Sequence, residues 1–128
     1  MHEPGSVSVR RELRAGRVAT SRLSVIEIAS ALARREREGA FTVAERDRAV
    51  RRLNADLAAC ILVELSPELC TDAQGLVLRH VLRCGDAVQL ASGLYLQREG
   101  GQRVFFAAFD DRLNDAARAE GLTLISFA

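Results

Sequence analysis

Short apolar segments alternate with longer helical patterns along this chain, and this alternation limits the folds that it can adopt. The strand-like segments are residues 18–20, 61–65, 103–109 and 122–127, and the helical patterns are residues 6–15, 22–38, 43–59, 68–82, about 86–100 and 111–120. Two strands that are joined by a helix run parallel and are connected by a right-handed crossover. We therefore predict an α/β fold with a mostly parallel sheet.

The composition predicts one domain spanning residues 1–128. A chain of 128 residues that is 48% apolar can bury a core of domain size. The net charge of +1 creates no global field for nucleic acid or an anionic membrane. No apolar run approaches the roughly 20 residues of a membrane span, so no membrane association is expected. Three cysteines without C-x-x-C spacing argue against a zinc site and favour a reducing, cytoplasmic location.

The pattern after Thr42 is that of an amphipathic surface helix. Thr42 and Glu45 have the spacing of a capping box, and the helix is expected to end near Ala59. Its arginines alternate with acidic and apolar residues, which predicts a solvated, salt-bridged surface, with contact to an RNA backbone as the alternative. All basic residues of the chain are arginine, which suits bidentate phosphate contacts, although codon bias explains this usage too.

Arg103–Phe109 is the most apolar of the strand-like segments. A continuous apolar run is typical of a strand that is buried on both faces of a parallel sheet. The run ends at Asp110 and Asp111, where the last helix is expected to begin.

Three acidic residues stand out against apolar surroundings. Asp86 begins an otherwise apolar helix and shares a narrow polar strip with Gln89. Glu27 lies between two isoleucines early in helix 22–38, and Asp110 follows a predicted strand. Ligands of open α/β sheets gather beyond the carboxyl ends of the strands, and the topology should bring all three acids to that edge.

Three carboxylates that converge on one cleft repel one another unless a cation neutralises them. Hard divalent ions suit oxygen ligands, so Glu27, Asp86 and Asp110 are predicted to bind Mg²⁺ or Mn²⁺. Such an ion can orient water, lower the pKa of that water and stabilise the charge that develops on a phosphodiester.

Each acid also has an ordinary structural interpretation. Asp86 and Asp110 could cap their own helices, and Glu27 could lie on a solvated face near Arg34. The chain has no Gly-rich phosphate loop, and its histidines lack ligand spacing. His80 is interpreted as a core or surface residue, and Cys84 as a structural thiol.

Three stretches carry a resemblance to a known family: Ala19–Leu32, Arg83–Ser92 and Val104–Leu113, the last followed by an Ala-rich helix and Gly121-Leu122. In order and spacing they resemble the PIN domain family, in particular the VapC-type toxins of bacterial toxin-antitoxin pairs. The resemblance covers essentially the whole chain. It implies a three-layer fold with the sheet between helices.

The resemblance also implies a function and its residues. Family members are Mg²⁺- or Mn²⁺-dependent endoribonucleases whose clustered acids hold the metal. Glu27, Asp86 and Asp110 occupy three of these catalytic, metal-binding positions, and Asp111 the less constrained neighbouring one. Thr20 and Ser21 take the place of hydroxyl residues near the site. An RNA substrate, an antitoxin whose arginine reaches the acids, and homodimerisation through the early helices are implied as well.

The chain departs from the family pattern at its beginning. Members start with a short apolar strand that ends in an aspartate, and this chain begins after that point. That strand is central in the sheet, and because strands lie roughly 4.8 Å apart, its loss opens a gap of about 10 Å. We expect an N-terminally truncated domain that retains three of the four acids, with Met1 a misassigned start.

Three hypotheses for function follow. The first is a PIN domain ribonuclease toxin that hydrolyses RNA phosphodiesters. The second is a truncated, inactive PIN module that retains an antitoxin-binding or dimerisation surface. The third is an unrelated doubly wound domain that binds a nucleotide or acts as a receiver, and the missing Gly-rich turn counts against it.

Overall fold

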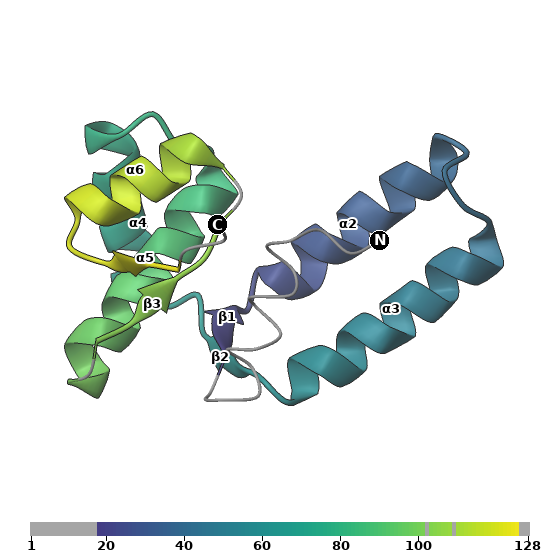
Figure 1. The fold of residues 1–128 in the computed structure, drawn as a ribbon, viewed down its shortest axis with the longest axis horizontal. Helices are drawn as coiled ribbons and strands as arrows, with labels where there is room; N and C mark the ends of the chain where they lie inside the picture. The colour runs from purple at the N-terminus through teal and green to yellow at the C-terminus, as the bar shows by residue number, and fades with distance from the viewer. Residues whose placement is uncertain (1–17, 102, 109, 126–128) are drawn as a thin grey trace.

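The computed structural model describes residues 18–101, 103–108 and 110–125. In chain order its elements are β1 (Ala19–Ser21), α2 (Ser24–Arg37), α3 (Val43–Ala58), β2 (Ile61–Val63), α4 (Pro67–Arg79), α5 (Cys84–Gly100), β3 (Phe105–Phe106), α6 (Asp111–Ala119) and β4 (Thr123–Leu124) (Figure 1). The predicted alternation of strands and helices, and with it the α/β class, is confirmed. The predicted helix over residues 6–15 lies outside the described residues.

The described strands form two separate parallel pairs. In one pair β1 runs beside β2, with Thr20 opposite Leu62, and in the other β3 runs beside β4, with Phe106 opposite Leu124. The sequence predicted a mostly parallel sheet that lacks its central strand, and each of the two sheets described has two parallel strands. Among the described residues, no strand lies hydrogen-bonded between the two pairs.

The strand predicted over Arg103–Phe109 is shorter and less buried than expected. Of the described residues in this segment, only Phe105 and Phe106 are in strand conformation, and Phe105 is 51% exposed. The prediction was wrong because β3 is hydrogen-bonded to β4 alone and has a core on one face only. The Arg103 guanidinium lies 5.0 Å from the centre of the exposed Phe105 ring, a cation–π contact.

α5 is the central element of the core, as its apolar sequence predicted. Its residues from Ala87 to Gly93 are buried except for the half-buried Gln89, and Leu90 is fully buried. The helix packs against α4, β1 and α6. Gly93 is needed for this packing, because a Cβ there would lie 3.2 Å from Leu122 and 3.3 Å from the ring of Phe106.

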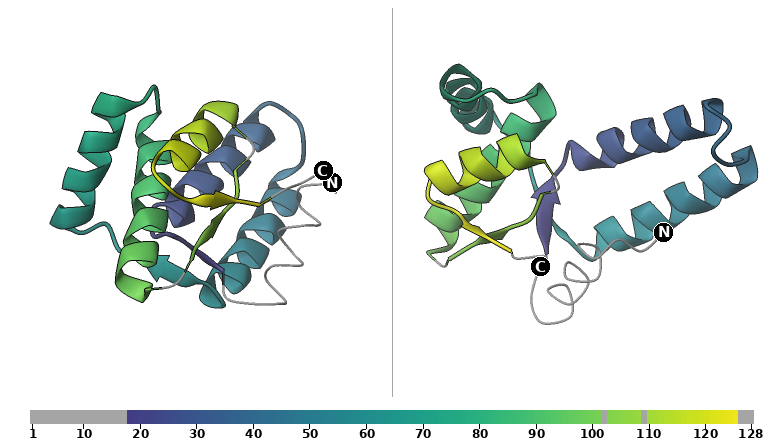
Figure 2. Two further views of the ribbon diagram at one scale, coloured as in Figure 1. Left: turned by 60° about the vertical axis from the view of Figure 1, so that its left-hand side comes forward. Right: turned by 45° about the horizontal axis from the view of Figure 1, so that its top comes forward.

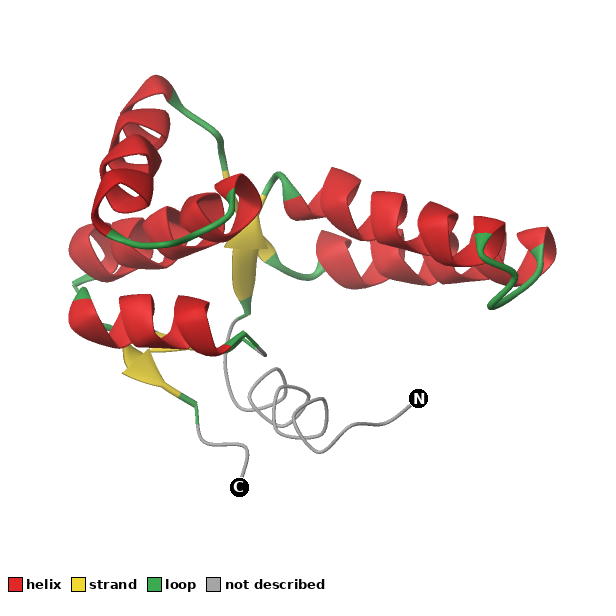
Figure 3. Cartoon of the chain, turned by 90° about the horizontal axis from the view of Figure 1, so that it is seen from above, coloured by secondary structure: helices red, strands yellow, loops and turns green. Residues whose placement is uncertain are grey.

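α2 and α3 form a helical hairpin that projects from the rest of the molecule (Figures 1 and 3). The right-hand view of Figure 2 shows the same pair apart from α4, α5 and α6. The predicted capping box at the start of α3 is present: Glu45 N donates to Thr42 Oγ1 at 3.1 Å, and Thr42 N donates to Glu45 Oε1 at 2.9 Å. An ion pair between Arg46 and Glu36, at 2.9 Å, joins the two helices.

None of the described helices has the length and apolar character that crossing a membrane requires.

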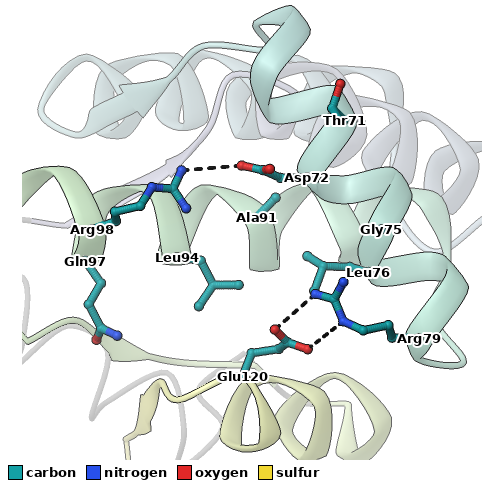
Figure 4. A pocket seen from close by; sticks show the side chains of 10 residues that line it. All are labelled: Thr71, Asp72, Gly75, Leu76, Arg79, Ala91, Leu94, Gln97, Arg98 and Glu120. Atoms are coloured by element: carbon teal, nitrogen blue, oxygen red, sulfur yellow. Dashed lines mark hydrogen bonds and ion pairs between the residues drawn. The ribbon is translucent and has the colours of Figure 1, made fainter.

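An ionic clasp connects α4 to the end of α6. Arg79 donates two hydrogen bonds to the carboxylate of Glu120, at 3.1 and 3.2 Å, and His80 Nε2 lies 2.7 Å from the same carboxylate. His80 is therefore a partly buried structural residue, as interpreted from the sequence. The clasp borders a cavity of about 420 Å³ between α4, α5 and α6, opposite the Arg98–Asp72 pair (Figure 4).

The clasp predicts a dependence of stability on pH. The hydrogen bonds from Arg79, and then the contact with His80, lower the pKa of Glu120 in the folded state. A lowered folded-state pKa adds stability that is fully present above the ordinary glutamate pKa and is lost as pH falls through the folded value. Glu120→Gln should therefore lower the urea midpoint at about pH 7 and have little effect near pH 3.

The matched control is Glu99→Gln, which removes an exposed carboxylate 3.7 Å from Arg98. Exposed ion pairs contribute little, so its midpoint should stay close to wild type at both pH values. Equal destabilisation by Glu120→Gln at both ends of the range would contradict an ionic role for the clasp.

Candidate active site

Two of the three predicted acids line one cavity. Asp86 and Asp110 both border a space of about 310 Å³ at the point where α5 and α6 begin. Val81, Leu82, Arg83 and Arg112 are the other lining residues. The cavity thus has two carboxylates from two different helices.

Asp86 does not cap its helix. The N-cap residue of α5 is Arg83, which makes no side-chain capping bond, and Asp86 lies within the first turn. Its half-buried carboxylate has no hydrogen bond or ion pair with the described residues. A negative charge in the first turn is favoured by the helix dipole, which helps to tolerate this unpaired acid.

Asp110 does cap its helix, so the structural interpretation of this acid is confirmed. It is the N-cap residue of α6, and its Oδ1 accepts a hydrogen bond of 3.0 Å from the backbone N–H of Leu113. A carboxylate has two oxygens, and this capping bond uses one of them. The exposed Asp110 side chain can therefore cap α6 and still offer an oxygen to a ligand.

Glu27 lies against the first turn of α5. A Cβ built on Gly85 would fall 2.0 Å from Glu27 Oε2, which places this carboxylate directly over the Gly85 backbone and beside Asp86 in sequence. Glu27 is exposed, as the solvated-face alternative requires, but it forms no ion pair with Arg34 or with any other described residue. Glu27 and Gly85, which are 58 positions apart in the sequence, are thus adjacent here, and only a residue without a side chain at position 85 leaves room for the Glu27 carboxylate.

A network of polar side chains holds α5 and α2 together next to these acids. Gln89 Oε1 accepts hydrogen bonds of 3.2 Å from Thr20 Oγ1 and from the Ser21 backbone N–H, while Gln89 Nε2 donates to Ser24 Oγ. Thr20 Oγ1 also lies 2.7 Å from Ser24 Oγ. We call Thr20, Ser21, Ser24 and Gln89 the Gln89 brace.

The brace lies one helical turn from the acids on both helices. Ser24 precedes Glu27 by three residues on α2, and Gln89 follows Asp86 by three residues on α5, so each pair shares a helix face. Sequence reasoning did not identify Gln89 as functional. The available signal was its position on the polar strip of Asp86 in a helix that is otherwise buried.

The donor set agrees in chemistry with a hard divalent cation. Glu27, Asp86 and Asp110 supply only oxygen, and none of them is paired with a described cation. As their side chains stand, no group of three or more His, Cys, Asp or Glu residues among those described is arranged to hold a metal ion. Exposed carboxylates reorient at little cost, and Mg²⁺ keeps several of its waters, so a preformed cage is not required.

Comparison with known families gives one match. The model of the PIN domain matches residues 2–119, a range that contains Glu27, Asp86 and Asp110. No curated protein matches the chain.

The contact between Glu27 and Gly85 generates a prediction about metal affinity. Gly85→Ala should displace the Glu27 carboxylate and weaken Mn²⁺ binding about tenfold in titration calorimetry. Stability should not fall, because Ala is favoured over Gly in a helix and the displaced group is the end of a flexible side chain. Gly100→Ala is the matched control, since a Cβ at this position of the same helix meets nothing within 4 Å. Unchanged Mn²⁺ affinity in Gly85→Ala would show that the observed position of Glu27 is not needed for binding.

The Gln89 brace generates a prediction about stability. Gln89→Ala leaves the Ser21 N–H and the hydroxyls of Thr20 and Ser24 without their shared partner, and should cost about 2 kcal/mol of unfolding free energy. Gln74→Ala changes an exposed glutamine on α4 that makes no hydrogen bond with the described residues, and should stay within about 0.5 kcal/mol of wild type. Chemical denaturation measures both values. If the two variants lost equal stability, the brace would not be a structural element.

Proposed function

Because the chain belongs to the PIN domain family, we propose that it is a metal-dependent endoribonuclease that hydrolyses RNA phosphodiesters in the cytoplasm. PIN domains are nucleases, which gives the general class of activity. The observation that supports the specific site is the shared cavity of Asp86 and Asp110, with the Glu27 carboxylate against the first turn of α5.

In this proposal Glu27, Asp86 and Asp110 hold Mg²⁺ or Mn²⁺. When bound, the ion lowers the pKa of a water molecule and stabilises the negative charge that develops on the phosphodiester. The protein orients the carboxylates: the Gln89 brace fixes the spacing of α2 and α5, and the Leu113 N–H fixes Asp110. Asp110 therefore acts both as helix cap and as ligand.

We further propose that the protein is a VapC-type toxin with an antitoxin as its partner and that it forms a homodimer. Exposed apolar side chains support protein contacts on two surfaces. Ile26 is 67% exposed on the projecting hairpin, which agrees with dimerisation through the early helices. Val81 is 77% exposed and lines the acidic cavity, where an antitoxin segment that covers the site would lie, and Leu78, near the end of α4, is 82% exposed.

The alternative is a catalytically inactive PIN module that retains the antitoxin-binding or dimerisation surface. One observation favours it: among the residues that the structure describes, no three acids are already arranged around a common metal position.

The variant Asp86→Asn distinguishes the nuclease proposal from the inactive-module alternative. If the chain is a nuclease, this isosteric change should abolish Mn²⁺ binding in calorimetry and reduce Mn²⁺-dependent cleavage of RNA at least about a hundredfold. Asp56→Asn, on the exposed side of α3, is the control and should leave both values unchanged. A wild-type chain that neither binds Mn²⁺ nor cleaves RNA would favour the inactive module instead.

A further inference from the structure

The acidic cavity also contains two arginines. Arg83 immediately precedes α5, and Arg112 is in the first turn of α6. Asp86 and Asp110 come from the same two turns. Each helix start therefore contributes one carboxylate and one guanidinium to a single cavity of about 310 Å³.

Neither arginine is neutralised by a described carboxylate. Arg83 and Arg112 are exposed, and they make no ion pair with any residue that the structure describes, although two aspartates line the same cavity. Other arginines on these helices behave differently: Arg98 of α5 pairs with Asp72, and Arg118 of α6 pairs with Asp115. The hydrogen-bond donors of both cavity guanidiniums thus remain available to a ligand.

The guanidiniums and carboxylates of this cavity do not pair with each other, so the cavity can bind a ligand that has both an anionic and a cationic group. A phosphodiester that is accompanied by a divalent cation is such a ligand, because carboxylates bind the cation and guanidiniums bind the non-bridging oxygens. The beginnings of α5 and α6 both border the cavity, and helix N-termini attract anions. The two guanidiniums and the helix N-termini therefore favour a phosphate group in this position, and a cation bound by the carboxylates would offset their repulsion of it.

We propose that Arg83 and Arg112 bind a phosphodiester of single-stranded RNA at the cavity of Asp86 and Asp110 and orient it for hydrolysis. This inference rests on the proposed ribonuclease function. It can be tested separately, because binding of phosphate by arginine requires no metal, whereas cleavage does.

The test is fluorescence anisotropy of a labelled RNA of about 10 nucleotides, with the full chain and with EDTA present so that no cleavage occurs. Arg83→Gln and Arg112→Gln should each raise the dissociation constant about tenfold, and should each reduce the salt slope by about 0.7, the value for one phosphate contact on a single strand. Arg→Lys at either position should restore part of the affinity, because it keeps the charge but loses the bidentate geometry.

Arg51→Gln is the matched control. Arg51 is an exposed arginine on α3 without an ion pair to a described residue, so its removal changes the net charge by the same amount. Its dissociation constant should stay within about twofold of wild type. If Arg51→Gln weakened RNA binding as much as Arg83→Gln, the attraction would be diffuse and the inference would be overturned.

Calorimetry with Mn²⁺ separates direct binding from an indirect structural effect. Removal of a positive charge beside a cation site should leave the Mn²⁺ affinity of Arg83→Gln and Arg112→Gln unchanged or higher. Loss of Mn²⁺ affinity in these variants would show that the arginines position the acids, and would overturn their assignment to RNA.

Failure of this inference is distinguishable from failure of the proposed function. If RNA binding in EDTA depends on Arg83 and Arg112 but no RNA is cleaved in Mn²⁺, the inference is supported and the proposed nuclease function is contradicted. Mn²⁺-dependent cleavage with wild-type KM in both glutamine variants supports the nuclease and overturns the inference. Absence of any RNA binding by the wild-type chain overturns it as well.

Discussion

The side-chain amide of Gln89 joins the two parts of the fold that carry acidic residues. Its oxygen accepts from β1 and its nitrogen donates to the start of α2, so three elements meet at one half-buried group. Ser24 lies one turn from Glu27 on α2 and Gln89 lies one turn from Asp86 on α5, so these hydrogen bonds set the spacing of the two helices next to the acids. The spacing is therefore maintained by neutral hydrogen bonds, and the charges of the acids are left free for a ligand.

The parts of the fold that could be predicted from the sequence are those that depend on neighbours along the chain. Thr42 and Glu45 are three residues apart and form the reciprocal hydrogen bonds of a capping box, so the local pattern alone identified the start of α3. The apolar helix after Asp86 was likewise recognised as buried. Phe105 was misplaced because the burial of a strand depends on which strands lie beside it, and no local pattern contains that information.

The candidate site likewise has features that could be predicted from the sequence and features that could not. Asp86, Glu27 and Asp110 were selected because a charge among apolar residues is unusual, and two of them, Asp86 and Asp110, line one cavity in the structure. The contact of Glu27 with Gly85 could not be predicted, since it depends on how closely two helices approach. The arginines of the cavity were also missed, because in a chain whose basic residues are all arginine no single one stands out.

The projecting hairpin has a mechanical consequence. α2 is one uninterrupted helix of 14 residues, so its length is about 21 Å. Glu27 lies in its first turn, and Arg37, its last residue, lies at the tip of the hairpin (Figure 1). A continuous helix tilts as a lever, so a force applied at the tip is transmitted along the axis to the Glu27 carboxylate. A tilt of α2 would therefore change the position of the Glu27 carboxylate relative to Gly85 at the start of α5.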